Sequence, residues 1–368
     1  MLDRPRVDYI APVPRDGVSG RAKASREKAA ALARVAPGSR VFLLEGGGGR
    51  IARRVGSLAL ELRYLLTVLR DGAPDAIVTR SSFPFGAFLV RRLRGVPLFR
   101  EMHADLGDEA PAIAGGNRLL RAALLLAHRF DIWAIRRADG VIFNHPQLER
   151  HVRDRYLRSE TPTTTVPNGT DPAVFRPLDR AVCRQELGLD AALRYLVWVG
   201  SISPWHGVES LLPLAGALPL EYRVLVVGPL DSGHARRLLE DVRGRRVAFT
   251  GPVPPETAVR YMNAADACLL PVAPVRVSPG SALKLFDYAA CGAPVICQER
   301  TEGYSDIVLE TGIGTAVDFR DPATAARIIH AFLPAPDRLR EHIRRTAEAR
   351  FSWERRMEEW IRFIEAVT

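Results

Sequence analysis

The chain has 368 residues, of which 47% are hydrophobic and 26% charged, as is typical of soluble globular proteins. This length favours two domains of about 150–200 residues over a single core. Its longest apolar runs are too short to span a bilayer, and its first residues lack the apolar core of a signal peptide. The four cysteines lie in apolar segments without metal-ligand spacing, which predicts reduced core thiols in a cytoplasmic protein.

The net charge of +10 comes from basic residues that are often interleaved with acids. A nucleic-acid-binding protein would instead cluster them with aromatic residues, so no nucleic-acid partner is expected. Anionic substrates or an anionic membrane surface suit this charge better, and a compositional bias towards arginine is the alternative explanation.

Short apolar runs alternate with amphipathic helical patterns along the chain. Most runs lack polar–apolar alternation, as expected of parallel strands covered on both faces. A turn-rich segment at 161–172 and a linker at about 172–190 separate two sets of such strands, and an amphipathic helix with Ser352 as its N-cap ends the chain. The order predicts an α/β fold with two Rossmann-like doubly wound domains, whose expected strands are 7–10, 41–44, 76–79, 98–101, 140–143, 195–199, 223–227, 247–250, 267–270 and 294–297.

The most informative segment is 278–296, in which small residues precede a short helix, a Gly-Ala-Pro turn and a buried strand. A helix that begins on small residues presents free N–H groups and the positive end of its dipole, an arrangement suited to phosphate. Lys284 falls in the first turn and Asp287 one turn later, so both can face one ligand. Only three of the 52 basic residues are lysine, and a compact ammonium suits a crowded diphosphate. An ordinary surface lysine is the alternative.

Two further segments of the second half follow predicted strands. Gly200 lets the backbone approach a ligand at the carboxyl edge of its strand, and His206 lies in the same loop between Trp205 and Gly207. Val253 follows the strand at 247–250, where a nucleotide base would lie in an open α/β sheet. The alternatives are a surface histidine and a tight strand-to-helix turn.

In the first half, several acids and His103 gather at the end of the strand at 98–101, where an α/β enzyme would place its chemistry. The alternative is a solvated loop. A loop of small residues at 16–21 follows the first strand and resembles the small-residue loops that form the floor of a crevice. The helical patterns at 58–70 and 119–137 are apolar and basic, so they predict either core faces or contacts with a membrane surface.

Together these segments resemble family 4 glycosyltransferases, which are retaining enzymes of the GT-B architecture. The resemblance covers nearly the whole chain and involves an interdomain segment, two loops after strands and the donor motif, at residues 166–177 (VPNGTDPAVFRP), 199–207 (VGSISPWHG), 249–271 and 281–296 (SALKLFDYAACGAPVI).

The resemblance implies an acceptor-binding domain at 1–175 facing a donor-binding domain at 176–350 across a cleft, with a helix at 351–368 packing back on the first domain. It implies transfer from a nucleoside-diphosphate sugar without a metal or other cofactor. His103 would lie beside the transferred sugar, with Lys284 and His206 as the other catalytic residues. The donor-binding residues would be Gly200, Ser201, Val253, Arg276, Gly280, Ser281, Ala282, Leu283 and Asp287. The residues of the acceptor side would be Gly17, Ser19, Gly20 and Asp105.

The sequence departs from the family pattern at three positions. Ser201 and His206 stand where the family has an Arg and a Lys on the donor diphosphate, and Pro279 replaces the first of two glutamates. The diphosphate charge then falls to Lys284, Arg276 and the helix N-terminus. These departures keep a non-catalytic GT-B partner subunit open as an alternative, whereas the missing Gly-x-Gly-x-x-Gly disfavours an NAD-linked oxidoreductase. The acceptor, a glycolipid, polysaccharide intermediate or small metabolite, remains open, as does peripheral contact with the inner membrane face.

Overall fold

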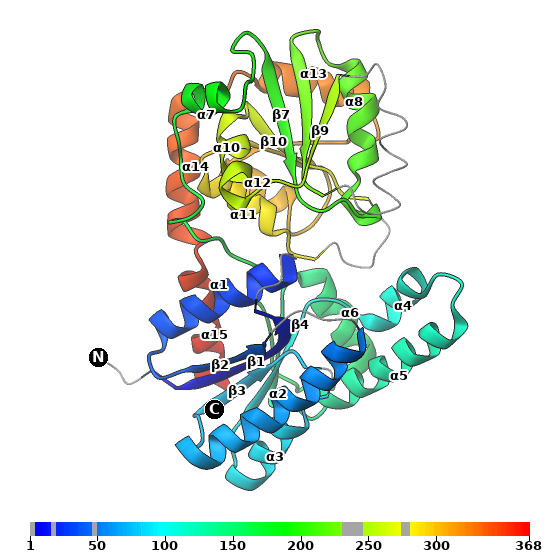
Figure 1. The fold of residues 1–368 in the computed structure, drawn as a ribbon, viewed down its shortest axis with the longest axis vertical. Coiled ribbons are helices and arrows are strands. Elements are labelled where there is room, and N and C mark those ends of the chain that lie inside the picture. The colour runs from blue at the N-terminus through cyan, green and yellow to red at the C-terminus, as the bar shows by residue number, and fades with distance from the viewer. Residues whose placement is uncertain (1–3, 16–19, 46–49, 82, 230–245, 274–279) are drawn as a thin grey trace. The chain divides into compact units, whose positions relative to one another are not determined.

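The computed structural model describes residues 4–15, 20–45, 50–81, 83–229, 246–273 and 280–368 (Figure 1). The backbone forms two compact units, one of residues 1–168 with 353–368 and the other of residues 169–352. The boundaries expected from sequence were 175/176 and 350/351. Arg276 and Pro279, together with Gly17 and Ser19, lie outside the described residues.

The N-terminal unit is built on a parallel sheet of six strands in the order β2-β1-β3-β4-β5-β6. Its central strands are buried along their whole length, which explains why the sequence shows apolar runs without alternation. The strands are β1 (Val7–Pro14), β2 (Arg40–Leu44), β3 (Ala76–Thr79), β4 (Leu98–Met102), β5 (Gly140–Phe143) and β6 (Thr163–Thr165). The helices are α1 (Gly20–Val35), α2 (Arg50–Asp71), α3 (Phe85–Arg94), α4 (Leu106–Ala114), α5 (Arg118–Ile135), α6 (Pro146–Tyr156) and α15 (Trp353–Val367).

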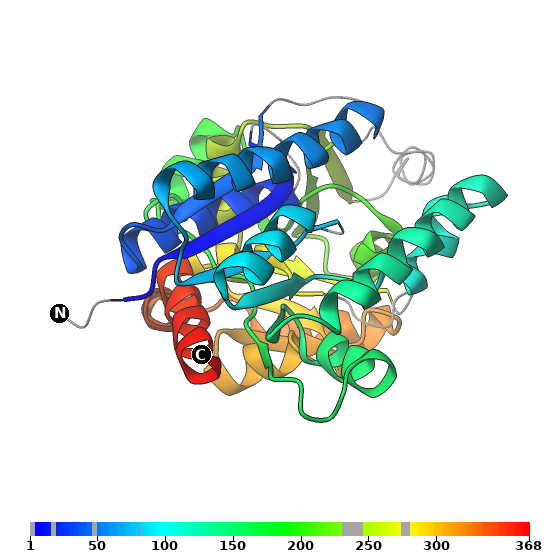
Figure 2. The same ribbon diagram turned by 90° about the horizontal axis from the view of Figure 1, so that it is seen from below.

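The strand order decides which face of this sheet each helix covers. The connection from β1 to β2 runs in the opposite direction to those from β2 to β3, β3 to β4 and β4 to β5. Because such crossovers are right-handed, α1 covers one face while α2, α3 and α5 cover the other. The C-terminal helix α15, red in Figures 1 and 2, packs against α1. Trp353 and Trp360 are the buried aromatic residues of its inner face.

The second unit repeats this architecture with a parallel sheet in the order β12-β11-β10-β7-β8-β9. Its strands are β7 (Arg194–Val199), β8 (Tyr222–Val227), β9 (Val247–Gly251), β10 (Ala267–Leu270), β11 (Val295–Gln298) and β12 (Gly314–Val317). The helices and 3₁₀ turns are α7 (Arg180–Glu186), η1 (Pro204–His206), η2 (Val208–Ser210), α8 (Leu211–Ala217), α10 (Pro255–Ala264), α11 (Leu283–Ala290), α12 (Ser305–Thr311), α13 (Pro322–Phe332) and α14 (Asp337–Arg350). Two doubly wound α/β units therefore confirm the predicted fold class.

Two of the four edge strands, β6 and β12, are not among the strands predicted from the sequence. Residues 161–172 were interpreted as a turn-rich segment, but residues 163–165 pair with β5. Edge strands need fewer apolar residues because one side has no neighbouring strand, so a run of three threonines suffices. All four cysteines are buried free thiols, as predicted. Across the described part of the chain, no helix is long and apolar enough to cross a membrane.

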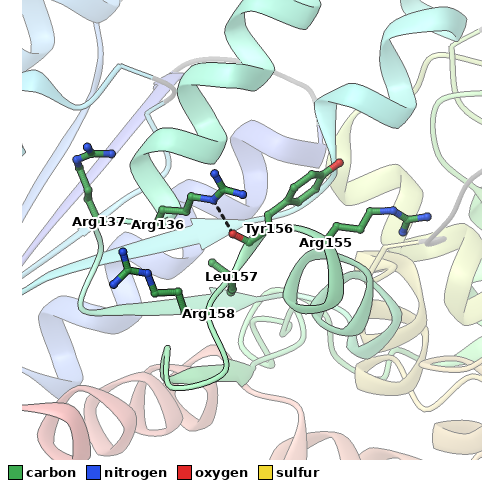
Figure 3. Close-up of a pocket in the computed structure, with 6 residues that line it drawn as sticks. All are labelled: Arg136, Arg137, Arg155, Tyr156, Leu157 and Arg158. Atoms are coloured by element: carbon green, nitrogen blue, oxygen red, sulfur yellow. Dashed lines mark hydrogen bonds between the residues drawn. The ribbon is translucent and has the colours of Figure 1, made fainter.

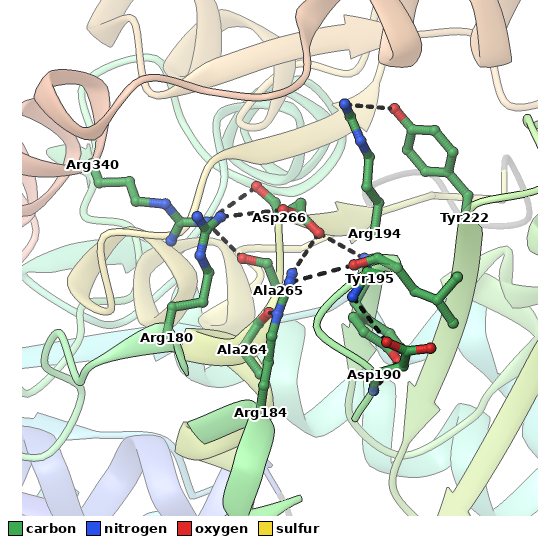
Figure 4. Close-up of polar contacts among 12 residues, drawn as sticks. Arg180, Arg184, Asp190, Arg194, Tyr195, Tyr222, Ala264, Ala265, Asp266 and Arg340 are labelled. Atoms are coloured by element: carbon green, nitrogen blue, oxygen red, sulfur yellow. Dashed lines mark hydrogen bonds and ion pairs between the residues drawn. The ribbon is translucent and has the colours of Figure 1, made fainter. Parts of the chain in front are cut away.

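Asp266, at the start of β10, joins the amino edge of the second sheet to α7 (Figure 4). One carboxylate oxygen accepts from the backbone amide of Tyr195 at 2.7 Å and pairs with Arg184 at 2.7 Å. The other oxygen lies 3.2 Å from Arg180. Since the side chains of Asp266 and Arg184 are only 9% and 11% exposed, this carboxylate neutralises a nearly buried cation.

We expect Asp266→Ala to lower the free energy of unfolding of this unit by about 3 kcal/mol, because Arg184 and the Tyr195 amide lose their partner. Chemical denaturation measures the change. The matched control is Glu186→Ala, which removes an exposed ion pair with Arg260 and should change stability by less than about 1 kcal/mol. Equal effects of the two substitutions would contradict the assignment.

Candidate functional site

Three glycines meet at the carboxyl ends of β7, β8 and β9. The amide of Gly200 donates to the carbonyl of Val227 at 2.9 Å, and the amide of Gly228 donates to Gly251 at 3.1 Å. A Cβ on Gly228 would lie 2.0 Å from the carbonyl oxygen of Gly200, so no larger residue fits there. The sequence predicts a role for Gly200 but not for Gly228, although β7 and β8 both end in an apolar run followed by glycine.

Helix α11 begins beside this glycine edge. Its N-cap, Ala282, has only a methyl side chain, which cannot accept a hydrogen bond from the first turn. The Tyr288 hydroxyl of α11 accepts from the backbone amide of Val199 at 2.8 Å, which anchors the helix to the end of β7. The strand order changes direction between β7 and β10, and the crevice at such a point is where open α/β sheets bind ligands.

Lys284 reaches from the first turn of α11 to the end of β7. Its Nζ lies 4.0 Å from the centroid of the Trp198 ring and 3.2 Å from where a Cβ on Gly200 would stand. Burial lowers the pKa of Lys284 to about 7. Among the described residues, no carboxylate forms an ion pair with it. A partly buried ammonium beside an uncapped helix N-terminus and a glycine edge is suited to binding an anion.

The remaining residues expected at the donor surround this point in different ways. His206 ends η1 and packs against the rings of Trp198 and Trp205, with centroids 5.6 and 6.0 Å apart. Trp198 therefore contacts both Lys284 and His206. Ser201 is exposed. The partly exposed residues are Val253 after β9, Gly280, Ser281 and Ala282 before α11, and Leu283 at the start of α11.

Asp287 was expected to accept from ribose hydroxyls. The structure places it on α11 with 5% of its surface exposed. Its Oδ1 accepts from the Thr170 hydroxyl at 2.9 Å. One carboxylate oxygen thus joins α11 to the first residues of this unit.

In the N-terminal unit, His103 follows β4 and forms a dyad with Glu101. The His103 Nε2 lies 2.6 Å from Glu101 Oε1, and its Nδ1 lies 3.0 Å from the Asn144 Nδ2. Because an amide nitrogen only donates, Nδ1 accepts and the Nε2 proton points to the carboxylate. Burial and the charge of Arg80 lower the pKa of His103 to about 3, so the imidazole is neutral.

Glu101 also binds two residues, Tyr9 and Lys28, that the sequence does not single out as site residues. The Tyr9 hydroxyl donates to its Oε2 at 2.8 Å, and Lys28 forms a buried ion pair with its Oε1. Burial tends to raise the pKa of Glu101, but the charge of Lys28 and the hydrogen bond from His103 hold this pKa well below its usual range. The rarity of lysine that singled out Lys284 applies equally to Lys28.

The C-terminal helix covers this ion pair. The Lys28 ammonium lies 5.5 and 5.3 Å from the ring centroids of Trp353 and Trp360, both on α15. Burial lowers the pKa of Lys28, which Glu101 opposes. The helix α15 therefore supports the dyad through Lys28.

Asp105 lies in a separate polar cluster that joins α4, α5 and α6. It caps α4 by accepting from the Gly107 amide at 2.8 Å, and its carboxylate lies 3.1 Å from His128 and 3.0 Å from His151. Asp108 lies 3.0 Å from the same His151 nitrogen. Asp105 is thus 4% exposed within this cluster, while Gly20, also expected on the acceptor side, is the exposed first residue of α1.

Ligand atoms of Asp105, Asp108 and His151 lie within 4.8 Å of one another, as a metal site would require. Arg155, however, contacts the Nδ1 of His151. Because arginine only donates, that nitrogen accepts, and Nε2 carries the proton that faces both carboxylates. This arrangement favours a hydrogen-bonded cluster over a set of metal ligands.

Each of the two units matches a known protein family. A Glycosyl transferase 4-like domain matches residues 7–169, and Glycosyl transferases group 1 matches residues 194–334. A D-inositol 3-phosphate glycosyltransferase of Nocardia farcinica is 32% identical over 72% of the chain, and D-inositol 3-phosphate glycosyltransferase 2 of Catenulispora acidiphila is 30% identical over 72%. The chain spans only 60% and 64% of the lengths of these relatives.

Solved structures share the fold over nearly the whole chain. Sucrose-phosphate synthase of Thermosynechococcus elongatus matches with a TM-score of 0.76 at 21% identity, covering 98% of both chains. HepE of Anabaena, solved in complex with UDP-glucose, matches with a TM-score of 0.72 at 17% identity, covering 98% of this chain and 100% of the other. The fold and both domain matches place the chain in the GT-B glycosyltransferase superfamily. Within it, the chain combines a Glycosyl transferase 4-like domain with a group 1 domain.

Proposed function

We propose that the protein is a retaining glycosyltransferase, of the hexosyltransferase type, that moves a sugar from a nucleoside-diphosphate sugar to an acceptor hydroxyl. The main support is Lys284, a partly buried cation held at the N-terminus of α11 beside Gly200. In this proposal its ammonium and the first amides of α11 stabilise the leaving diphosphate, which is an electrostatic rather than an acid–base task. The HepE complex with UDP-glucose is a precedent for a nucleotide sugar in this fold.

The acceptor is proposed at the level of chemical class. Both relatives are named for D-inositol 3-phosphate, so a phosphorylated polyol joins the glycolipid, polysaccharide intermediate and small metabolite as candidates. His103 is proposed to contact the transferred sugar. Since both of its nitrogens are already engaged, Glu101 and Asn144 would set the orientation of its ring.

The decisive experiment screens UDP-, GDP- and ADP-sugars for thermal stabilisation of the protein and for donor hydrolysis. A donor that raises Tm and is hydrolysed slowly supports the proposal. The alternative, a non-catalytic GT-B partner subunit, is favoured by Ser201 and His206 at positions where the family has cations. Binding of a nucleotide sugar without any hydrolysis or transfer, alone or with candidate acceptors, would support that alternative.

We further propose that transfer needs no metal ion, because the donor charge is met by Lys284 and the amides of α11. Activity is therefore expected to survive EDTA without loss. The assay compares initial rates with and without the chelator, using a metal-dependent glycosyltransferase as the positive control. Loss of activity that Mg²⁺ or Mn²⁺ restores would overturn this proposal and redirect attention to Asp105, Asp108 and His151.

The proposed location is the cytoplasm, with peripheral association at the inner face of the membrane. Support comes from the basic composition and from the apolar side chains exposed on α2, α3 and α5.

A further inference from the structure

Helix α2 has two apolar stripes where folding requires only one. Leu60, Tyr64 and Val68 are buried against the sheet. On the other side Leu58, Leu62, Leu66 and Leu69 are 55%, 52%, 58% and 59% exposed. At 100° per residue the two stripes point in nearly opposite directions, so the second faces away from the sheet.

The neighbouring helices extend this exposed stripe. Leu89 and Leu93 of α3 are 40% and 65% exposed, and Phe130 and Trp133 of α5 are 41% and 43% exposed. The Trp133 ring packs on Phe88 of α3, with centroids 4.9 Å apart, so α3 and α5 are in direct contact. Since α2, α3 and α5 cover the same face of the sheet, these side chains form one surface, here named the α2–α3–α5 surface. Contiguous exposed apolar residues on this scale indicate an interaction site.

The charged side chains of these three helices are almost all cationic at the surface. Their three acids are Glu61, which is buried, Asp71, which pairs with Arg70, and Asp131, which pairs with the buried Arg100. The exposed arginines on the three helices and at the end of α5 include Arg92, Arg94, Arg129, Arg136 and Arg137.

Arginines also line two pockets at the end of α5. A pocket of about 440 Å³ is lined by Arg136, Arg137, Arg155 and Arg158, with Tyr156 and Leu157 (Figure 3). Arg136 and Arg137 also line a second pocket, of about 520 Å³, together with Phe88 and Trp133. The Arg137 guanidinium lies 4.6 Å from the centroid of the Trp133 ring. The apolar surface thus continues directly into a cationic rim.

We propose that the α2–α3–α5 surface docks on an anionic phospholipid bilayer. Its leucines and aromatic rings would enter the interfacial region, and the arginines of the rim would bind lipid phosphates. A second copy of the chain is disfavoured, because a two-fold interface would press unpaired arginines against arginines without acids to neutralise them. This inference deepens the proposed location and does not depend on sugar transfer.

The test is co-sedimentation of the full chain with vesicles of phosphatidylcholine alone and of phosphatidylcholine mixed with phosphatidylglycerol. Wild type is expected to bind the mixed vesicles, more weakly as salt rises, and to bind the neutral vesicles poorly. The double variant Leu62→Gln/Leu66→Gln should lose about tenfold or more of the affinity. Arg136→Gln/Arg137→Gln should weaken binding and flatten the salt dependence.

Matched controls come from the second unit. Leu309→Gln on α12 changes a leucine that is 57% exposed, close to the 58% of Leu66, and Arg338→Gln/Arg345→Gln removes two exposed arginines of α14. Both should bind like wild type. Wild type that ignores the mixed vesicles at low salt, or a Leu62→Gln/Leu66→Gln variant that binds them normally, overturns the proposal. A dimer in solution that depends on Leu62 would also overturn the proposal. Measuring whether UDP raises the Tm of the same variants distinguishes failure of membrane docking from failure of the proposed sugar transfer.

Discussion

Lys284→Met is expected to lower kcat/KM by about 10²–10³-fold, on the scale of losing one electrostatic contact to a developing charge. Methionine keeps the length and apolar stem of the side chain, so its packing on Trp198 is retained while the charge is lost. The measurement is steady-state transfer or donor hydrolysis with the best donor from the screen. Kinetics like those of wild type would remove Lys284 from the proposed mechanism.

The lowered pKa of Lys284 predicts a particular pH dependence. The free protein has a pKa of about 7 at this site, and a bound diphosphate raises it, because an opposite charge favours the protonated form. The complex then holds more protons than the free protein above about pH 7. Donor affinity should therefore be highest at lower pH and fall as pH rises above that value. Lys284→Arg is the control, since its guanidinium stays charged and its affinity should be nearly independent of pH in this range.

We expect Lys284 to lower the folding stability of the protein when no ligand is bound. Its folded pKa of about 7 lies below the unfolded value of about 10.4. Between these values the unfolded chain binds more protons, so wild-type stability should rise with pH across that window. Lys284→Met should remove this dependence and raise the Tm of the ligand-free protein. A variant that is both inactive and destabilised would indicate disrupted packing instead.

Much of the fold could be predicted because it depends on local patterns. Apolar runs without alternation marked the buried strands, and repeated β-α order indicated two doubly wound units. The strands β6 and β12 were missed because these two edge strands, of sequence TTT and GTAV, lack a continuous apolar run. The donor segment could be predicted for the same reason as the fold, because it too consists of local sequence features. A glycine-ended strand and the helix at 283–290 are local features, and Lys284 stands out by composition.

The dyad was harder to predict because its members come from distant segments. Tyr9, Lys28, Glu101 and Asn144 lie on different elements, and their meeting at His103 depends on strand order. Asp105 showed the reverse problem. Proximity in sequence to His103 suggested a shared site, yet capping of α4 and the ring of His151 draw this carboxylate into a separate cluster. Sequence distance is thus a poor guide at the ends of parallel strands, where neighbours come from different crossovers.

We also expect Glu101→Gln to lower the free energy of unfolding strongly. The side chains of Lys28 and Glu101 are only 3% and 2% exposed. Removing the carboxylate leaves a buried ammonium without its counter-charge, which typically costs about 3–5 kcal/mol. Lys28→Met/Glu101→Gln removes both charges and should recover much of the lost stability. Denaturation of the two single variants and the double variant completes the cycle.

The direction in which stability changes with pH shows whether Lys28 and Glu101 form a charged pair in the folded protein or only pack closely. The folded pKa of Glu101 lies well below its usual range, so the pair contributes stability above the unfolded pKa of about 4.3, and this contribution is lost as pH falls towards the folded value. Stability of Lys28→Met/Glu101→Gln should therefore decline less steeply in acid than that of wild type. Identical acid profiles would contradict the assigned charge state.

Activity of the refolded double variant tests what the ion pair does for His103. With both charges gone, the Nε2 proton of His103 still faces a neutral amide oxygen, but the carboxylate that orients the ring is absent. We expect kcat to fall about tenfold while the KM for donor changes little, because Lys284 and Gly200 are untouched in the other unit. A stable double variant with normal kcat would show that Lys28 and Glu101 serve folding alone, and that the orientation of His103 is set by Asn144.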